Sequence, residues 1–183
     1  MGSRVDVVRS ELLLLRYRAG DAAAFPELVA LWERPLLYYL CRLLESEPDA
    51  WDALQDTWVR VIRSQGRLRD EYAFPAWLYT IARNTAYTML RRRREMDALP
   101  EDDAPGGIPA SGEPTLAGWD AMDIHAALAR LSLPHRDVLT LHFLEGFSIS
   151  EIGAITGCAE GTIKSRIHHA KRAVRARLEE QTS

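Results

Sequence analysis

The chain has 183 residues, a formal net charge of −3 and an apolar fraction of 47%, a composition typical of folded soluble proteins that excludes wholesale disorder. No apolar run approaches the ~18 residues that a membrane-spanning helix needs, and no N-terminal segment is organised like a secretory signal. We therefore expect a cytoplasmic protein, without membrane insertion, built from one ordinary domain or two small ones.

Apolar residues recur at helical spacing along most of the chain, and clear period-two alternation is absent, so the sequence predicts an all-α fold. The first helix is expected from about Val5 to Ala19, with Gly20 as its left-handed stop and Asp21 as the N-cap of the next helix. That second helix is expected over 22–44. It contains Pro35, where the missing backbone N–H favours a kink or a break.

A third helix restarts at "SEPDAWD", with Asp49 as the expected cap, and ends before Gly66. One side of this helix carries Asp52, Gln55 and Asp56. Their spacing fits either a solvated polar surface or a docking face for a basic protein, and spacing alone does not separate the two.

The fourth helix is expected from "FPAW", where proline suits the first turn, to about Glu95. One face mixes cations, an amide and an aromatic ring, which suit phosphates, base edges and unstacked bases respectively. Core packing is an equal alternative for Phe74. The residues predicted to contact DNA from this helix are Phe74, Thr80, Arg83, Asn84, Tyr87, Arg91 and Arg94.

The composition changes from Asp97 to Gly118, a stretch rich in proline and acidic residues that contains no Lys or Arg. Such a composition is typical of a linker. The sequence thus predicts two small helical domains, at 5–95 and 119–180, joined by a flexible linker at 96–118.

Near the C-terminus the sequence predicts a helix-turn-helix. Ser148 and Glu151 fit a capping box, Gly157 ends the short helix, and a second helix begins near Glu160. Its apolar stripe starts at Ile163, and a basic surface runs beside it.

A recognition helix in the DNA major groove requires donors for phosphates and guanine edges. The alternative is an ordinary solvated basic face. The residues predicted to contact DNA from the second helix are Thr162, Lys164, Ser165, Arg166, His168, His169, Lys171 and Arg172.

Other chemistry is not indicated by the residues. Cys41 and Cys158 are too few for a disulfide framework, and the adjacent His168 and His169 point in different directions on a helix. We see no nucleophile–base pair, metal-ligand spacing or Gly-rich phosphate loop. We therefore predict no cofactor, no metal site and no enzymatic activity.

Taken together, these motifs resemble the extracytoplasmic-function (ECF) group of sigma factors in the sigma-70 family. "DAWDALQDTWVRVIR" resembles region 2.2, "FPAWLYTIARNTAYTMLRRRRE" resembles regions 2.3 and 2.4, and "LPHRDVLTLHFLEGFSISEIGAITGCAEGTIKSRIHHAKRAV" resembles region 4. The resemblance covers nearly the whole chain. It departs from the common pattern at Trp51, Asp56, His168 and His169, and the two histidines leave the preferred −35 sequence open.

The resemblance implies a dissociable specificity subunit of bacterial RNA polymerase that directs promoter recognition and opening. Region 2 would bind the −10 element and, through Asp52, Gln55 and Asp56, the β′ clamp, while region 4 would bind the −35 element and the β flap. It also implies an anti-sigma partner. Two rival hypotheses are a stand-alone helix-turn-helix regulator of duplex operators and a decoy that captures an anti-sigma factor without initiating transcription.

Overall fold

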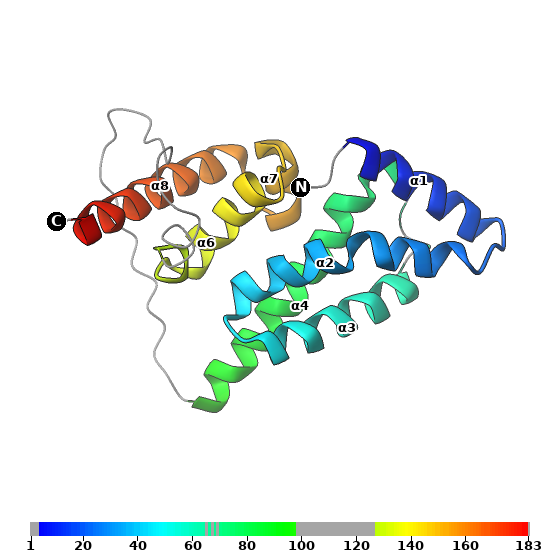
Figure 1. The fold of residues 1–183 in the computed structure, drawn as a ribbon, viewed down its shortest axis with the longest axis horizontal. Coiled ribbons are helices and arrows are strands. Elements are labelled where there is room, and N and C mark those ends of the chain that lie inside the picture. The colour runs from blue at the N-terminus through cyan, green and yellow to red at the C-terminus, as the bar shows by residue number, and fades with distance from the viewer. Residues whose placement is uncertain (1–3, 65, 67, 69, 98–126, 183) are drawn as a thin grey trace.

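A computed structural model of the protein describes residues 4–97, apart from 65, 67 and 69, and residues 127–182 (Figure 1). All regular elements in these ranges are helical, which confirms the predicted all-α class. Nearly all of the predicted linker at 96–118, and the start of the predicted second domain, lie outside the described residues. Below, the N-terminal unit denotes the described part of residues 4–97, and the C-terminal unit denotes residues 127–182.

The N-terminal unit is a helical bundle whose boundaries follow the predicted stops. Its elements are α1 (Arg4–Arg18), α2 (Ala24–Leu44), α3 (Glu47–Ser64), the short turn η2 (Glu71–Ala73) and α4 (Phe74–Asp97). Gly20 ends α1 in the left-handed region, at φ 96°, as predicted. Of the two outcomes expected at Pro35, the break is wrong, because the helix α2 runs unbroken past this residue. The predicted cap at Asp49 is also wrong: the Ser46 hydroxyl, 3.4 Å from the backbone nitrogen of Asp49, takes the capping place.

The C-terminal unit contains the predicted helix-turn-helix. Its elements are α6 (Leu133–Leu139), the wider helical turn η3 (Thr140–Leu144), α7 (Ile149–Thr156) and α8 (Glu160–Thr182). The Ser148–Glu151 capping box is complete in both directions. Gly157 adopts φ 71°, and a Cβ on Gly153 would lie 3.0 Å from the Cys158 carbonyl oxygen. The turn between α7 and α8 is thus tight for identifiable reasons: one glycine supplies the left-handed conformation and the other the close approach.

The buried apolar side chains of the two units form one continuous core cluster. Leu28, Leu36 and Leu40 of α2 face the bundle interior, and the Trp32 indole N–H donates to the Ser10 hydroxyl at 2.8 Å. In the C-terminal unit the predicted stripe of α8, which includes Ile163, is buried against α6 and α7. Because one face of α8 is buried, the residues on its opposite face are exposed to solvent.

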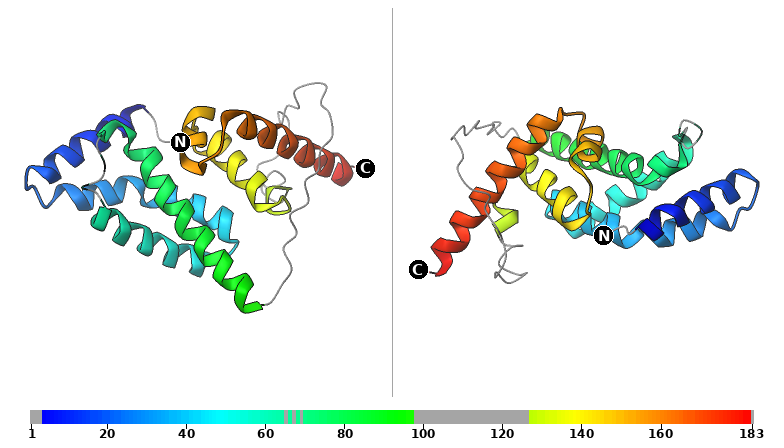
Figure 2. Two further views of the ribbon diagram at one scale, coloured as in Figure 1. Left: turned by 180° about the vertical axis from the view of Figure 1, so that it is seen from behind. Right: turned by 90° about the horizontal axis from the view of Figure 1, so that it is seen from above.

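The two units also pack against each other: α4 lies along α7, and α2 meets α6 (Figures 1 and 2). Tyr79 of α4 is fully buried at this contact, with its ring 4.8 Å from the Phe147 ring. Beyond the contact, α8 leads away from the bundle (Figure 2). Within the described ranges, no helix is sufficiently long and apolar to span a bilayer.

Candidate nucleic-acid and polymerase interfaces

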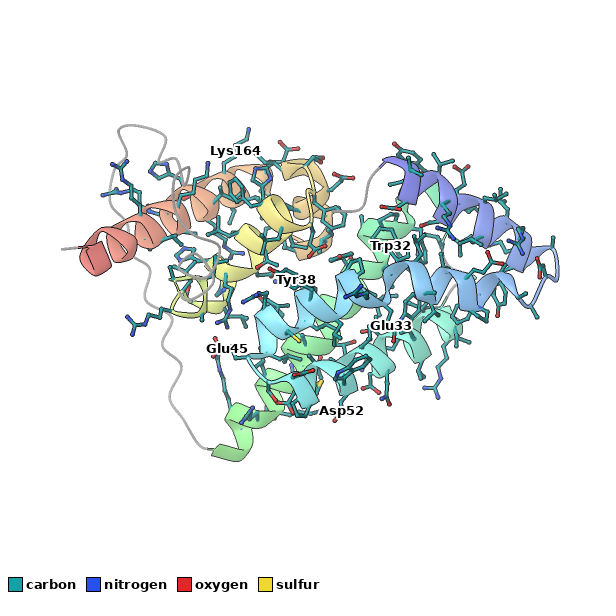
Figure 3. The ribbon with its side chains drawn as sticks, viewed as in Figure 1. Trp32, Glu33, Tyr38, Glu45, Asp52 and Lys164 are labelled. Carbon is teal, nitrogen blue, oxygen red and sulfur yellow. The ribbon has the colours of Figure 1, made fainter. Side chains whose placement is uncertain are left out.

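The first half of α8 presents a polar, cationic surface to solvent. Thr162, Lys164, Ser165 and Arg172 are exposed, and Lys164 points away from the N-terminal unit (Figure 3). Because Ile163 and Ile167 anchor the opposite side of the helix, these side chains are held outward on a rigid element. Such a surface offers the donors that DNA phosphates and guanine edges accept.

The other four predicted contacts of α8 are half-buried and engaged within the C-terminal unit. Arg166 donates to the Cys158 sulfur at 3.5 Å, and the Lys171 ammonium lies 4.9 Å from the Phe143 ring centre. The Nε2 atom of His168 is buried without a hydrogen-bond partner in the described structure. The ring of His169 lies 6.5 Å from that of His135. Burial, followed by the nearby His169 and Arg166, lowers the pKa of His135.

The predicted face of α4 divides into an exposed part and a covered part. Asn84, Arg91 and Arg94 are exposed. The Thr80 hydroxyl donates to the Ala76 carbonyl at 2.8 Å. Phe74 is 0% exposed, so the structure places it in the core, and in this arrangement it cannot stack on a base.

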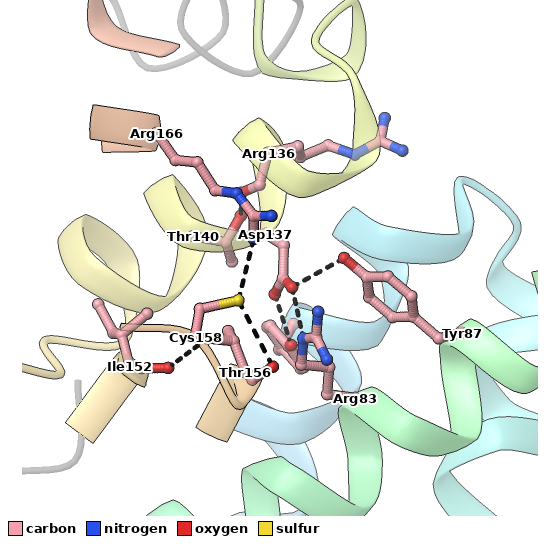
Figure 4. A network of polar contacts seen from close by, with 10 residues as sticks. Arg83, Tyr87, Arg136, Asp137, Thr140, Ile152, Thr156, Cys158 and Arg166 are labelled. Carbon is pink, nitrogen blue, oxygen red and sulfur yellow. Dashed lines mark hydrogen bonds and ion pairs between the residues drawn. The ribbon is translucent and has the colours of Figure 1, made fainter. Parts of the chain in front are cut away.

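Arg83 and Tyr87, the remaining two predicted contacts of α4, converge on one carboxylate of the C-terminal unit (Figure 4). Arg83 Nε lies 2.7 Å, and the Tyr87 hydroxyl 2.9 Å, from Asp137 Oδ2. The Tyr39 hydroxyl of α2 donates to Asp137 Oδ1 at 2.8 Å. Asp137 is 1% exposed. The two groups predicted to meet DNA are therefore covered by the other unit.

Burial and Asp137 shift the pKa values of this cluster. Burial, followed by the Asp137 charge, raises the pKa of both Tyr39 and Tyr87. Burial, the largest single effect, would lower the pKa of the Arg83 guanidinium, but Asp137, Tyr87 and Tyr39 together outweigh it and the pKa is raised. The tyrosines therefore remain neutral donors and Arg83 remains a cation at any physiological pH.

Two further polar contacts join the units. The Tyr79 hydroxyl donates to Glu145 Oε2 at 2.5 Å in a buried setting. Burial raises the pKa of the Glu145 carboxyl, and the hydrogen bond from Tyr79 opposes this rise only in part. Arg136 pairs with Glu45 at the C-terminal end of α2. Beside these contacts lies a cavity of about 410 Å³ whose lining includes Trp32, Tyr79 and Phe147. The contact is thus hydrogen-bonded at its centre and hollow along one side.

The helix α3 presents the predicted acidic face on a different side of the molecule from Lys164 (Figure 3). Asp52, Gln55 and Asp56 are all exposed. Val59 and Ile62 lie beside them and are 42% and 47% exposed. Exposed aliphatic side chains next to carboxylates provide both the apolar area and the charge that a protein-binding surface uses.

The sequence did not indicate the residues that join the units. Tyr39 and Tyr79 stand at ordinary apolar positions of their helices, and their partners Asp137 and Glu145 are 98 and 66 residues away in sequence. One signal was present: Arg136 and Asp137 form a charged pair inside an apolar helical segment, and such a pair requires partners if it is buried.

No group of three or more potential metal-binding side chains occurs among the residues that the structure describes. The described surfaces instead combine cations, exposed carboxylates and aliphatic side chains. These groups are suited to binding macromolecules.

Comparison with known proteins gives matches for both units. Residues 28–96 match the family model described as sigma-70 region 2, and residues 121–174 match the model described as sigma-70, region 4. The chain is 35% identical to RNA polymerase sigma factor CarQ of Myxococcus xanthus, over 90% of this chain and 95% of CarQ. It is 30% identical to RNA polymerase sigma-H factor of Pseudomonas aeruginosa, over 91% of this chain and 92% of that protein.

Among solved structures, the fold is similar to that of the sigma factor RpoE from Bartonella quintana, which was crystallised in complex with the anti-sigma factor NepR. The TM-score is 0.68, with 30% identity over 85% of this chain and 96% of that chain. CnrH, in complex with the cytosolic domain of CnrY, gives a TM-score of 0.69 at 22% identity, over 94% of this chain and 98% of that chain. The CnrH likeness concerns the fold alone.

Proposed function

The chain belongs to the ECF group of RNA polymerase sigma factors in the sigma-70 family. From this premise we propose which of its surfaces binds each promoter element and which binds the polymerase. The N-terminal unit serves as region 2 and the C-terminal unit as region 4. The observation that carries this assignment is the presence of separate outward faces, cationic on α8 and acidic–aliphatic on α3. A DNA-binding subunit of a larger enzyme needs one face of each kind.

The α8 surface binds the −35 element. Thr162, Lys164 and Ser165 are exposed in the N-terminal half of the helix, the part of a recognition helix that meets base edges. Arg172 lies further along and contacts phosphate. The half-buried Arg166, His168, His169 and Lys171 contribute when DNA binding turns their side chains outward. Region 4 also contacts the β flap of the polymerase.

The α4 surface binds the −10 element. Asn84, Arg91 and Arg94 are exposed and can approach DNA without rearrangement. Arg83 and Tyr87 become accessible only when the C-terminal unit moves off α4, because Asp137 holds both. We therefore infer that the structure represents a closed form, and that the units separate in the initiation complex.

The α3 surface docks on the β′ clamp of core polymerase. Asp52, Gln55 and Asp56 provide acceptors for a basic partner, and Val59 and Ile62 provide apolar area beside them. Binding of this kind is governed by a few buried anchors surrounded by charge pairs.

An anti-sigma factor binds the closed form. Support comes from the cavity between the units, whose lining includes Trp32, Tyr79 and Phe147, and from the similar sigma factor that was crystallised with an anti-sigma factor. The protein works in the cytoplasm, uses no cofactor and performs no covalent reaction; promoter opening is driven by binding energy.

Run-off transcription with bacterial core polymerase on a promoter library tests this function. The proposal predicts polymerase-dependent transcripts from a subset of promoters. A stand-alone regulator would instead protect duplex operators without polymerase, and a decoy would yield no transcript with any promoter. Either result would remove the initiation role.

A further inference from the structure

The side chains that hold Asp137 form an anion site that belongs entirely to the N-terminal unit. The Tyr39 hydroxyl comes from α2, and Arg83 and Tyr87 come from α4. The Arg83 guanidinium carbon lies 4.1 Å from the centre of the Tyr87 ring, which fixes the guanidinium in place. All three donors therefore belong to one unit, and the stacking of Arg83 on Tyr87 does not depend on a residue of the C-terminal unit.

The occupant of this site comes from the other unit. Asp137 accepts all three hydrogen bonds, at 2.7–2.9 Å. Each hydrogen bond that the described structure assigns to its side chain goes to the N-terminal unit, so its carboxylate has no comparable bonding role within its own unit.

Arginine and tyrosine side chains are among the usual donors to DNA phosphate oxygens. An arginine presents its N–H groups to a carboxylate or a phosphate in the same way. Arg83 and Tyr87 lie on the helix that also carries the exposed Asn84 and Arg91, so a DNA strand following that helix would bring a phosphate to the same place.

We propose that Tyr39, Arg83 and Tyr87 form a binding site for one phosphodiester of the promoter strand, and that Asp137 occupies this site as an internal phosphate mimic in the closed form. The proposal rests on the function assigned above and adds Tyr39 and Asp137 to it. Region 4 then competes with DNA for region 2, and the free protein is held back until the polymerase separates the units.

The test uses the free full-length chain and a fluorescent single-stranded 20-mer of random sequence, with binding measured by anisotropy at several salt concentrations. Asp137→Asn should bind about tenfold more tightly, because the closed parent protein binds the strand without the phosphate contact at this site and the variant gains it. The slope of log K against log[salt] should steepen by about 0.7, the value for one additional phosphate contact on a single strand. Glu47→Gln, which removes one exposed surface charge, should change neither quantity beyond error.

A second substitution separates the anion site from simple opening. Adding Arg83→Ala to Asp137→Asn should abolish the gain in affinity and restore the original salt slope. If the gain in affinity persists without Arg83, Asp137 only holds the two units together, and the proposal of a phosphate site is wrong. An unchanged affinity in a folded Asp137→Asn protein would overturn the whole inference.

If Asp137→Asn does not fold, as judged by circular dichroism, Tyr79→Phe replaces it. This change weakens the contact between the units at Glu145 and leaves Asp137 and its three donors intact. It should also raise the affinity for the 20-mer in an Arg83-dependent manner, and a folded Tyr79→Phe protein with no such gain would refute the inference. These measurements contain no polymerase, so their failure is distinguishable from failure of the transcription assay.

Discussion

Removing one hydroxyl from the contact between the units should open the protein. Tyr79→Phe retains the ring that packs on Trp32, Tyr39 and Phe147 but deletes the donor to Glu145. Glu145 is only 6% exposed, so in the closed form its Oε2 atom would lose the 2.5 Å hydrogen bond, and only water in the adjoining cavity, which Glu145 also lines, could replace it. In the open form both groups are solvated, and the substitution costs little there.

Leaving a buried acceptor without its partner costs about 1–3 kcal/mol. Applied to the closed form alone, that cost shifts the closed–open equilibrium about 5–150-fold toward the open form. The matched control is Tyr17→Phe. Tyr17 packs on Phe25, with 5.3 Å between ring centres, near the α1–α2 turn, and the same chemical change there should not alter the equilibrium.

The separation of the units can be followed by energy transfer between two dyes. The dyes are attached at Arg60→Cys and Ala176→Cys in a protein whose Cys41 and Cys158 are replaced by serine. Tyr79→Phe should lower the mean transfer and add a low-transfer population, whereas Tyr17→Phe should resemble the parent protein. If Tyr79→Phe and the parent give the same distribution, the hydrogen bond to Glu145 does not stabilise the closed form.

Four further substitutions test two surfaces, a helix cap and the pH dependence of stability. Asp52→Arg should abolish co-purification with core polymerase because it reverses a docking charge, and undiminished co-purification would refute the docking face. Lys164→Ala should weaken binding to a −35 duplex and reduce its salt slope by about 0.9 if Lys164 contacts one phosphate; an unchanged slope would exclude that contact. Ser148→Ala should destabilise the C-terminal unit by about 1 kcal/mol in urea unfolding, since it removes an N-cap; a loss below the error of the measurement would argue against the cap. Folding lowers the pKa of His135, so as the pH drops the unfolded chain takes up the His135 proton at a higher pH than the folded chain, and the free energy of unfolding should fall through and below pH 6.5. His135→Gln should make this loss of stability with falling pH less steep. An equally steep loss in both proteins would show that another group is responsible.

Features determined by neighbouring residues could be predicted from the sequence. The left-handed stop at Gly20, the end of the short helix at Gly157 and the Ser148–Glu151 capping box all occur as expected, because each depends on a few adjacent residues. The break at Pro35 does not occur. Its neighbours Trp32 and Leu36 are buried, and this packing holds the helix together across the missing hydrogen bond.

The contact between the units could not be predicted. Tyr39 and Asp137 are 98 residues apart, and no local pattern marks a hydroxyl that will meet a distant carboxylate. The same contact changes the interpretation of α4: helical spacing correctly puts Arg83, Asn84 and Tyr87 on its polar side, but only the packing of the C-terminal unit shows that Asn84 faces solvent while Arg83 and Tyr87 are covered.

A closed sigma factor should open when polymerase holds its two units at separate promoter elements. Spin labels on Arg60→Cys and Ala176→Cys, in the same serine background, report the distance between the units. Double electron–electron resonance measures this distance before and after addition of core polymerase and is the most direct test of the opening. We expect a single short distance in the free protein and a substantially longer one in the holoenzyme. An identical distance distribution in the two states would show that polymerase does not separate the units.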